Sequence, residues 1–138
     1  MVYGVGRDDG ETSAITRAIE AAALGQAYEI PFSTRSCFQY AGDVAGAIVS
    51  AVRSDWGGAL LSDITERVSS VGDVLAAIEA VVPGAQVSKS TDERVSPASG
   101  FDTAPLGEVI GDWQETTLED GVRQTVELYR TIAADQTA

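Results

Sequence analysis

The residues best suited to chemistry lie within the first 40 positions. An acidic turn, residues 8–11 (DDGE), is followed by two hydroxyls at Thr12 and Ser13. The turn is similar to a piece of a calcium-binding loop, but the alternating ligands and the closing glutamate of such a loop are out of register. We therefore interpret residues 8–11 as a solvated turn. A hydrolase or isomerase site built from Asp8, Asp9 and Arg35 would rest only on this clustering of charge.

Histidine is absent from the sequence. Serine or cysteine triads of the usual kind, imidazole bases and histidine-ligated metal sites are therefore excluded. The single cysteine, Cys37, has no internal disulfide partner and no imidazole to activate it. We expect it to be a buried, unreactive thiol.

The glycines at positions 4, 6 and 10 do not form a dinucleotide-binding fingerprint. Their spacing differs from Gly-x-Gly-x-x-Gly, and polar residues follow where that motif needs a packed strand-to-helix turn. No phosphate cradle is predicted at this place. Val2 and Tyr3, running directly into the glycines, predict instead the end of a strand whose beginning lies upstream.

Composition predicts one folded unit spanning residues 1–138. Hydrophobic residues make up 44% and charged residues 22% of the 138 positions, as in soluble globular domains. A net charge of −12 repels phosphate backbones and anionic lipids, so neither nucleic acid nor membrane is expected as a partner. Without a long apolar run or a leader pattern, the expected location is the cytoplasm.

Hydrophobic periodicity and cap signals then place the elements. We expect helices over 12–24, from Asp43 to about 53, over 70–82, over 105–110 and from Thr117 to about 134. Short strands are expected over 27–32, 57–64 and 85–90, with the second one buried. Residues 91–100 should form a mobile surface loop, and the tail 135–138 should fray.

Four blocks, in this order, resemble a known family. They are VYGVGRDDGETSAITRAIEAAALGQAYEIPF, FQYAGDVAGAIVSAV, GALLSDITERVSSVGDVLAAIEAVVPGA and IGDWQETTLEDGVRQTVELYR. The pattern is similar to the C-terminal half of NAD-dependent epimerases/dehydratases, the extended short-chain dehydrogenase/reductase family. The resemblance implies an α/β fold of helices with a few short strands, in which the Rossmann core is largely missing.

The resemblance also implies which functional parts this chain lacks. In the family, the N-terminal half holds the glycine-rich cofactor turn and a Tyr-x-x-x-Lys pair, in which the lysine lowers the pKa of the tyrosine base. No tyrosine of this chain has a lysine four positions later, and Lys89 is the only lysine. The complete family enzyme is expected to use NAD(P), whereas this chain alone is expected to bind no cofactor and to be inactive.

Five residues become candidates for substrate contact through the resemblance. Thr12 and Ser13 match the start of the first substrate-domain helix, where a hydroxyl either contacts a sugar or caps the helix. Arg35 matches a position that faces phosphate or carboxylate in relatives, although a solvated loop arginine is the simpler alternative. Gln39 and Tyr40 match positions that line the family cleft, and Tyr40 could equally be a core aromatic. Asp43 is expected to be a helix cap.

We therefore expect the substrate-binding half of an oxidoreductase acting on a sugar, sugar acid or similar small polar substrate. The alternative is a non-catalytic acidic binding or assembly module derived from the same family. Expected partners are the small polar substrate and either a cofactor-binding half or further copies of the chain. Self-association would bury residues 59–64 and the face formed by Val44, Ile48 and Val52.

Overall fold

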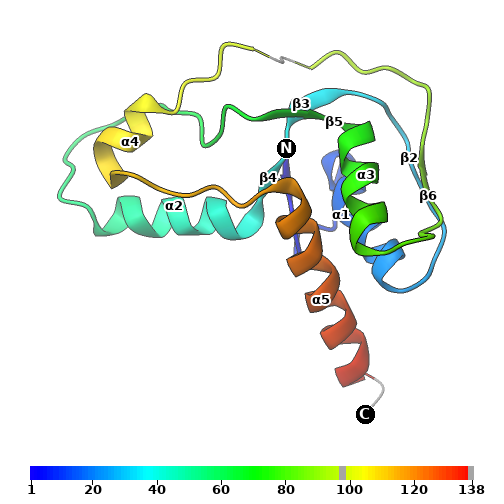
Figure 1. Cartoon of the computed structure of the whole chain (residues 1–138). Coiled ribbons are helices and arrows are strands. Elements are labelled where there is room, and N and C mark those ends of the chain that lie inside the picture. The colour runs from blue at the N-terminus through cyan, green and yellow to red at the C-terminus, as the bar shows by residue number, and fades with distance from the viewer. Residues whose placement is uncertain (97–98, 137–138) are drawn as a thin grey trace.

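The computed structural model describes residues 1–96 and 99–136 (Figure 1). It is an α/β structure of helices joined by short strands. The helices are the 3₁₀ turn η1 (Glu11–Ser13), α1 (Ala14–Ala23), α2 (Ala41–Arg53), α3 (Val71–Val81), α4 (Ala104–Ile110) and α5 (Leu118–Gln136). Within the described ranges, no helix is both long enough and apolar enough to cross a bilayer.

The strands form three separate pairs. β1 (Val2–Tyr3) runs parallel to β4 (Gln39–Tyr40), β2 (Tyr28–Ile30) runs parallel to β6 (Val87–Lys89), and β3 (Arg35–Cys37) runs antiparallel to β5 (Val68–Ser70). The β3 register places Arg35 opposite Ser70 and Cys37 opposite Val68. These pairs connect segments far apart in the sequence, but none of them is wide enough to form a hydrophobic layer by itself.

Helices α1, α3 and α5 pack together and enclose the apolar core (Figure 1). The predicted periodicity explains this packing, because Ile15 and Ile19 of α1 and Val122 and Val126 of α5 are at most 1% exposed. Tyr3 from β1 joins the same cluster at 1% exposure. We call β1, β2, β6, η1, α1, α3 and α5 the core lobe.

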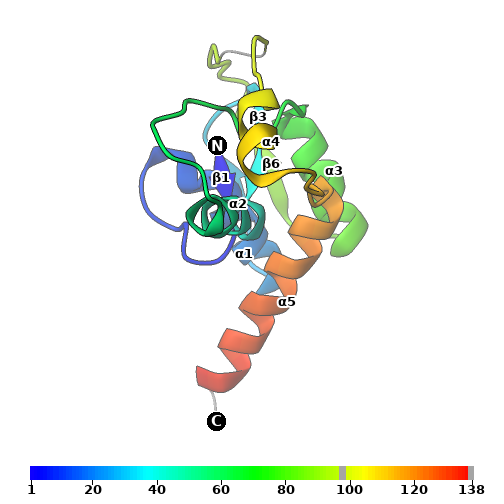
Figure 2. The ribbon, with the colours of Figure 1, turned by 90° about the vertical axis from the view of Figure 1, so that its left-hand side faces the viewer.

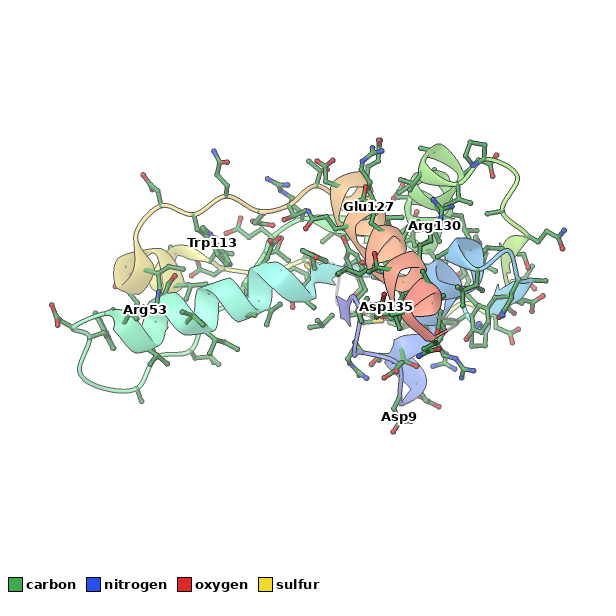
Figure 3. All side chains as sticks on the ribbon, turned by 90° about the horizontal axis from the view of Figure 1, so that it is seen from below. Asp9, Arg53, Trp113, Glu127, Arg130 and Asp135 are labelled. Atoms are coloured by element: carbon green, nitrogen blue, oxygen red, sulfur yellow. The ribbon has the colours of Figure 1, made fainter. Side chains whose placement is uncertain are left out.

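Helix α2 extends away from the core lobe, and the chain runs back toward the lobe after α4. Its main contacts are with α4, β4 and β1. Figure 2 shows α2 end-on with α4 above it, and in Figure 3 Arg53 lies at the far end of α2, remote from Glu127 and Arg130 on α5. We call residues 41–64 and 102–111 the arm.

The predicted helix boundaries are confirmed where the cap signals were strong. Ser70 and Asp73 form a reciprocal capping box at the start of α3, as the sequence predicted. Gly25 ends α1 and Gly111 ends α4, with φ values of 68° and 73° that favour glycine.

The predicted buried strand at 57–64 is wrong. The segment contains no strand, and Leu61 is 92% exposed. A short apolar run becomes a buried strand only if another strand accepts its backbone hydrogen bonds, and no neighbour pairs with this one in the described structure. Hydrogen bonds from Asp63 N to the Asp102 carbonyl and from Leu106 N to Ser62 Oγ hold the segment against α4 instead.

Two predicted boundary features remain predictions. Residues 91–96, 99 and 100 are exposed or half-buried loop, and positions 97–98 lie outside the described residues, so the mobility of 91–100 is untested. Helix α5 continues to Gln136, and the remainder of the predicted frayed tail 135–138 lies outside the described residues.

Candidate functional site

A polar cleft lies where β4 ends and α2 begins. It encloses about 140 Å³ between β4, the start of α2, residues 64–69 and the residues just before α5. The polar side chains that line it come from Gln39, Tyr40, Asp43, Thr65, Arg67, Ser69, Glu115, Thr116 and Thr117. Hydroxyl, amide and carboxylate groups of this kind suit a small ligand that carries several hydroxyls.

Asp43 and Thr116 form one wall of this polar cleft. The Thr116 backbone N–H donates to Oδ2 of Asp43 at 2.8 Å, and the Thr116 hydroxyl donates to Oδ1 at 2.6 Å. Asp43 was expected to cap its own helix, but the N-cap of α2 is Tyr40, whose side chain makes no cap hydrogen bond, and both Asp43 carboxylate oxygens accept from Thr116 instead. The carboxylate therefore connects the arm to the approach of α5.

Glu115 and Arg67 also line the cleft. Oε2 of Glu115 accepts a short hydrogen bond from the Thr65 hydroxyl and lies 3.7 Å from Nε of Arg67. The Arg67 side chain is 61% exposed, so this ion pair contributes little to stability. Its guanidinium can therefore turn toward a bound ligand at small cost.

The tyrosines beside the cleft are hydrogen-bond donors rather than bases. Burial, followed by the Asp43 charge, raises the pKa of Tyr40 above its ordinary value. Burial and the same carboxylate also raise the pKa of Tyr3, whose ring centroid lies 5.9 Å from that of Tyr40. Both phenols therefore stay protonated at neutral pH.

The structure places only two of the five sequence candidates at the cleft, Gln39 and Tyr40. Thr12 lies within η1, and its Oγ1 accepts a 2.6 Å hydrogen bond from Arg7, which belongs to the exposed turn before η1. The Ser13 hydroxyl is buried and donates to the Gly10 carbonyl at 2.6 Å. Neither hydroxyl lines the cleft.

Arg35 also lies outside the cleft lining. It is exposed on β3, and its charge makes the smallest contribution to lowering the pKa of Asp73, after the hydrogen bonds from Ser70. Its predicted contact with phosphate or carboxylate stays a prediction.

Sequence reasoning missed Thr65, Arg67 and Glu115. They come from irregular segments, where hydrophobic periodicity carries no information. One usable signal was the polar run from Gln114 to Thr117, which ends at the cap of the last helix, because such a run places several donors and acceptors at one helix N-terminus.

Cys37 is 3% exposed, with its thiol 3.6 Å from the Thr65 carbonyl oxygen. Burial raises the pKa of this thiol. The expectation of a buried thiol is confirmed, and the raised pKa disfavours the reactive thiolate.

The segment after β1 does not fit the pyrophosphate of a dinucleotide. Seven residues separate Tyr3 from η1, and Arg7 is held within this turn by Thr12 and the Asp9 carbonyl. A strand-turn-helix cradle would instead direct backbone N–H groups of a helix N-terminus at the phosphates. In the described ranges, no group of three or more His, Cys, Asp or Glu residues could hold a metal ion.

Sequence comparisons find no matching family and no matching curated protein. Solved structures do match. A partial-consensus L-threonine 3-dehydrogenase matches with a TM-score of 0.77 and 16% identity over 94% of this chain. A variant of UDP-glucuronic acid 4-epimerase from Bacillus cereus matches with a TM-score of 0.74 and 18% identity over 96% of the chain. MoeE5 in complex with UDP-glucose and NAD matches with a TM-score of 0.71 and 25% identity over 96%.

The chain spans less than half the length of these structures, namely 46%, 43% and 46%. The matched region is the C-terminal part of Rossmann-type short-chain dehydrogenase/reductase enzymes. The expected α/β fold and the resemblance to NAD-dependent epimerases/dehydratases are therefore confirmed at the level of the fold.

Proposed function

We propose that this chain is the substrate-binding portion of an NAD-dependent epimerase/dehydratase-type oxidoreductase that acts on a sugar or sugar acid. The observation that carries the proposal is the fold match, which covers at least 94% of this chain in all three structures described above. Two similar structures are complexes of MoeE5 with UDP-glucose or UDP-glucuronic acid, each with NAD. A hexose or hexuronic acid attached to a nucleotide is accordingly the substrate class that we infer.

The polar cleft supports binding of one sugar ring. Its volume of about 140 Å³ is smaller than the roughly 300–1,000 Å³ of cavities that enclose drug-sized ligands, so it cannot also hold a nucleotide. Carboxylate oxygens of Asp43 and Glu115 accept hydrogen bonds from sugar hydroxyls, and the amide of Gln39 both donates and accepts. Arg67 supplies the positive charge that a uronate carboxylate would need.

We assign no hydride transfer to this chain alone. The family base is a tyrosine whose pKa is lowered by a lysine, whereas the pKa values of Tyr3 and Tyr40 are raised. Lys89, the only lysine, donates to Ser33 Oγ at 3.0 Å. NAD chemistry would thus depend on residues outside this chain.

Thermal unfolding with single added ligands tests the proposal. UDP-glucose or UDP-glucuronic acid should raise the melting temperature by several degrees at saturation, because a ligand at 100 times its Kd stabilises by about 2.7 kcal/mol. NAD alone should produce no shift. Gln39→Ala should weaken the sugar-nucleotide shift, whereas Arg123→Ala, which breaks two exposed ion pairs on α5, should leave it unchanged.

Two results would contradict the proposal. One is a clear shift with NAD alone, and the other is a sugar-nucleotide shift that Gln39→Ala leaves intact. UDP without a sugar serves as a further control, since a shift that UDP reproduces fully would place recognition outside the polar cleft.

A non-catalytic binding or assembly module is the second candidate. The observation that favours it is the arm, whose apolar residues are extensively exposed. Affinity purification from the source cells separates the candidates. Recovery of a dinucleotide-binding protein supports the oxidoreductase, whereas recovery of an unrelated protein supports the module.

A further inference from the structure

The charged groups of the polar cleft are two carboxylates and one guanidinium. Among the described residues that line it, Asp43 and Glu115 are acidic and Arg67 is basic. Two negative charges against one positive charge leave the cleft negative, within a chain whose net charge is −12. The charge of a ligand therefore affects how well it binds in this cleft.

The carboxylate of Glu115 is held in the cleft by a buried hydroxyl. Thr65 is 4% exposed, and its Oγ1 accepts a hydrogen bond from the Arg67 backbone N–H at 3.1 Å. The Thr65 hydroxyl donates its proton to Oε2 of Glu115. The Glu115 side chain is 21% exposed. Turning it out of the cleft would leave a buried donor without an acceptor, which is costly.

The positive charge of the cleft is already paired. Nε of Arg67 lies 3.7 Å from the same Oε2 of Glu115. The Arg67 side chain is 61% exposed and can turn toward a ligand, but Glu115 would then stay behind without its counter-charge. A ligand carboxylate in the cleft would add a third negative charge beside one guanidinium.

The small size of the cleft keeps a ligand charge close to these groups. With a volume of about 140 Å³, a carboxylate on an enclosed sugar ring cannot lie far from Asp43 or Glu115. Asp43 is fixed by its two hydrogen bonds from Thr116. One like charge at about 4 Å weakens binding about fivefold even when water screens it. A neutral hydroxymethyl group instead donates a hydrogen bond to the same carboxylates.

On the basis of the function proposed above, we propose that the polar cleft selects a neutral hexose over the corresponding hexuronic acid. Glu115 is the specificity-determining residue. Its carboxylate repels a uronate directly and occupies Arg67, the guanidinium that a uronate would need. The substrate class is thereby narrowed to neutral hexoses attached to a nucleotide.

Isothermal titration calorimetry with UDP-glucose and UDP-glucuronic acid tests this selectivity, because the two ligands differ only at C6. The parent chain should bind UDP-glucose at least about fivefold more tightly at neutral pH. Glu115→Gln keeps the side-chain volume and an acceptor for Thr65, but it removes one charge and releases Arg67. It should raise the affinity for UDP-glucuronic acid by at least about fivefold and change that for UDP-glucose by less than about twofold. A merely structural role would change both affinities alike.

Glu119→Gln is the matched control. It removes the same charge from an exposed residue of α5 that is not among the residues lining the cleft, so the ratio of the two affinities should stay the same. Adding Arg67→Gln to Glu115→Gln should abolish the gain for UDP-glucuronic acid, because the guanidinium that receives the uronate is then missing.

The outcomes separate this selectivity from the proposed function. Equal or tighter binding of UDP-glucuronic acid by the parent chain would overturn the selectivity and leave the proposed function intact. A Glu115→Gln variant with an unchanged affinity ratio would do the same. Binding of neither sugar nucleotide by the parent chain would overturn the proposed function and the selectivity together.

Discussion

The core lobe and the arm are built from helices with similar sequence patterns but opposite burial. Helix α1 carries Ile15 and Ile19 at a spacing of four, and both are at most 1% exposed. Helix α2 carries Ile48 and Val52 at the same spacing, and they are 57% and 80% exposed. An apolar stripe therefore specifies a helix, while its burial depends on which elements are available to pack against it.

The two regions are also held together differently. In the core lobe, apolar side chains from α1, α3 and α5 interlock in one cluster. In the arm, hydrogen bonds between polar groups join the two segments, for example from Asp63 N to the Asp102 carbonyl oxygen at 3.0 Å and from Asp102 N to Oδ2 of Asp63 at 2.9 Å. We therefore expect the folding free energy to reside in the core lobe. Four pairs of substitutions follow, of which the first two compare the core lobe with the arm directly.

The largest effect is expected from truncating one isoleucine in each region. Ile19→Ala should lower the free energy of unfolding by about 2–5 kcal/mol, because it leaves a cavity in a fully buried site. Ile48→Ala should change it by less than about 0.5 kcal/mol. Urea denaturation of both variants beside the parent protein measures the two losses. Equal losses of unfolding free energy in the two variants would contradict the claim that the core lobe contributes more to stability than the arm.

Replacing a helical glycine by alanine should change the free energy of unfolding in opposite directions in the two regions. A Cβ at Gly121 in α5 would clash with the hydroxyl of Tyr3, which is itself fully buried. Gly121→Ala should therefore destabilise by about 1–3 kcal/mol. A Cβ at Gly107 in α4 meets no atom within 4 Å, so Gly107→Ala should stabilise by up to about 1 kcal/mol. Thermal denaturation of both variants is the measurement, and a stabilising Gly121→Ala would contradict the packing described.

Breaking the hydrogen bond that joins the two regions should have an intermediate effect on the free energy of unfolding. Thr116→Val removes the hydroxyl that donates to Asp43 at 2.6 Å while keeping the side-chain volume. We expect a loss of about 1–2 kcal/mol, since the acceptor is a carboxylate. Faster amide hydrogen exchange should be confined to the start of α2 and the residues before α5. Thr131→Val, whose hydroxyl bonds only within its own helix, is the control.

The smallest effect concerns the cap of α3 and depends on pH. Ser70→Ala should cost about 1 kcal/mol, because it removes the acceptor for the Asp73 N–H at the N-terminus of α3. Hydrogen bonds from Ser70 lower the pKa of Asp73, so the carboxylate stabilises the fold above its unfolded pKa of about 3.9. That contribution is lost as the pH falls through the lowered pKa that Asp73 has in the folded state. Asp73→Asn should thus be less stable than the parent at neutral pH, and the difference should shrink in acid.

The helices and their ends were determined by the sequence alone. Ser70 and Asp73 at capping-box spacing, Gly25 and Gly111 after apolar stripes, and the periodic valines of the last helix are local signals. Each acts through hydrogen bonds or dihedral angles within a few residues, so no distant segment is needed to interpret it. The buried Cys37 was likewise predictable, from the absence of any residue that could activate it.

Only the tertiary structure decided which apolar residues are buried and which polar residues meet. The segment 57–64 was expected to form a buried strand, yet its Leu61 is 92% exposed because no strand pairs with the segment in the described structure. Thr65, Arg67 and Glu115 converge at the polar cleft only because residues 64–69 lie beside the approach to α5. Burial and convergence depend on contacts between residues far apart in the sequence, such as Asp43 with Thr116, 73 positions later, which no local pattern encodes.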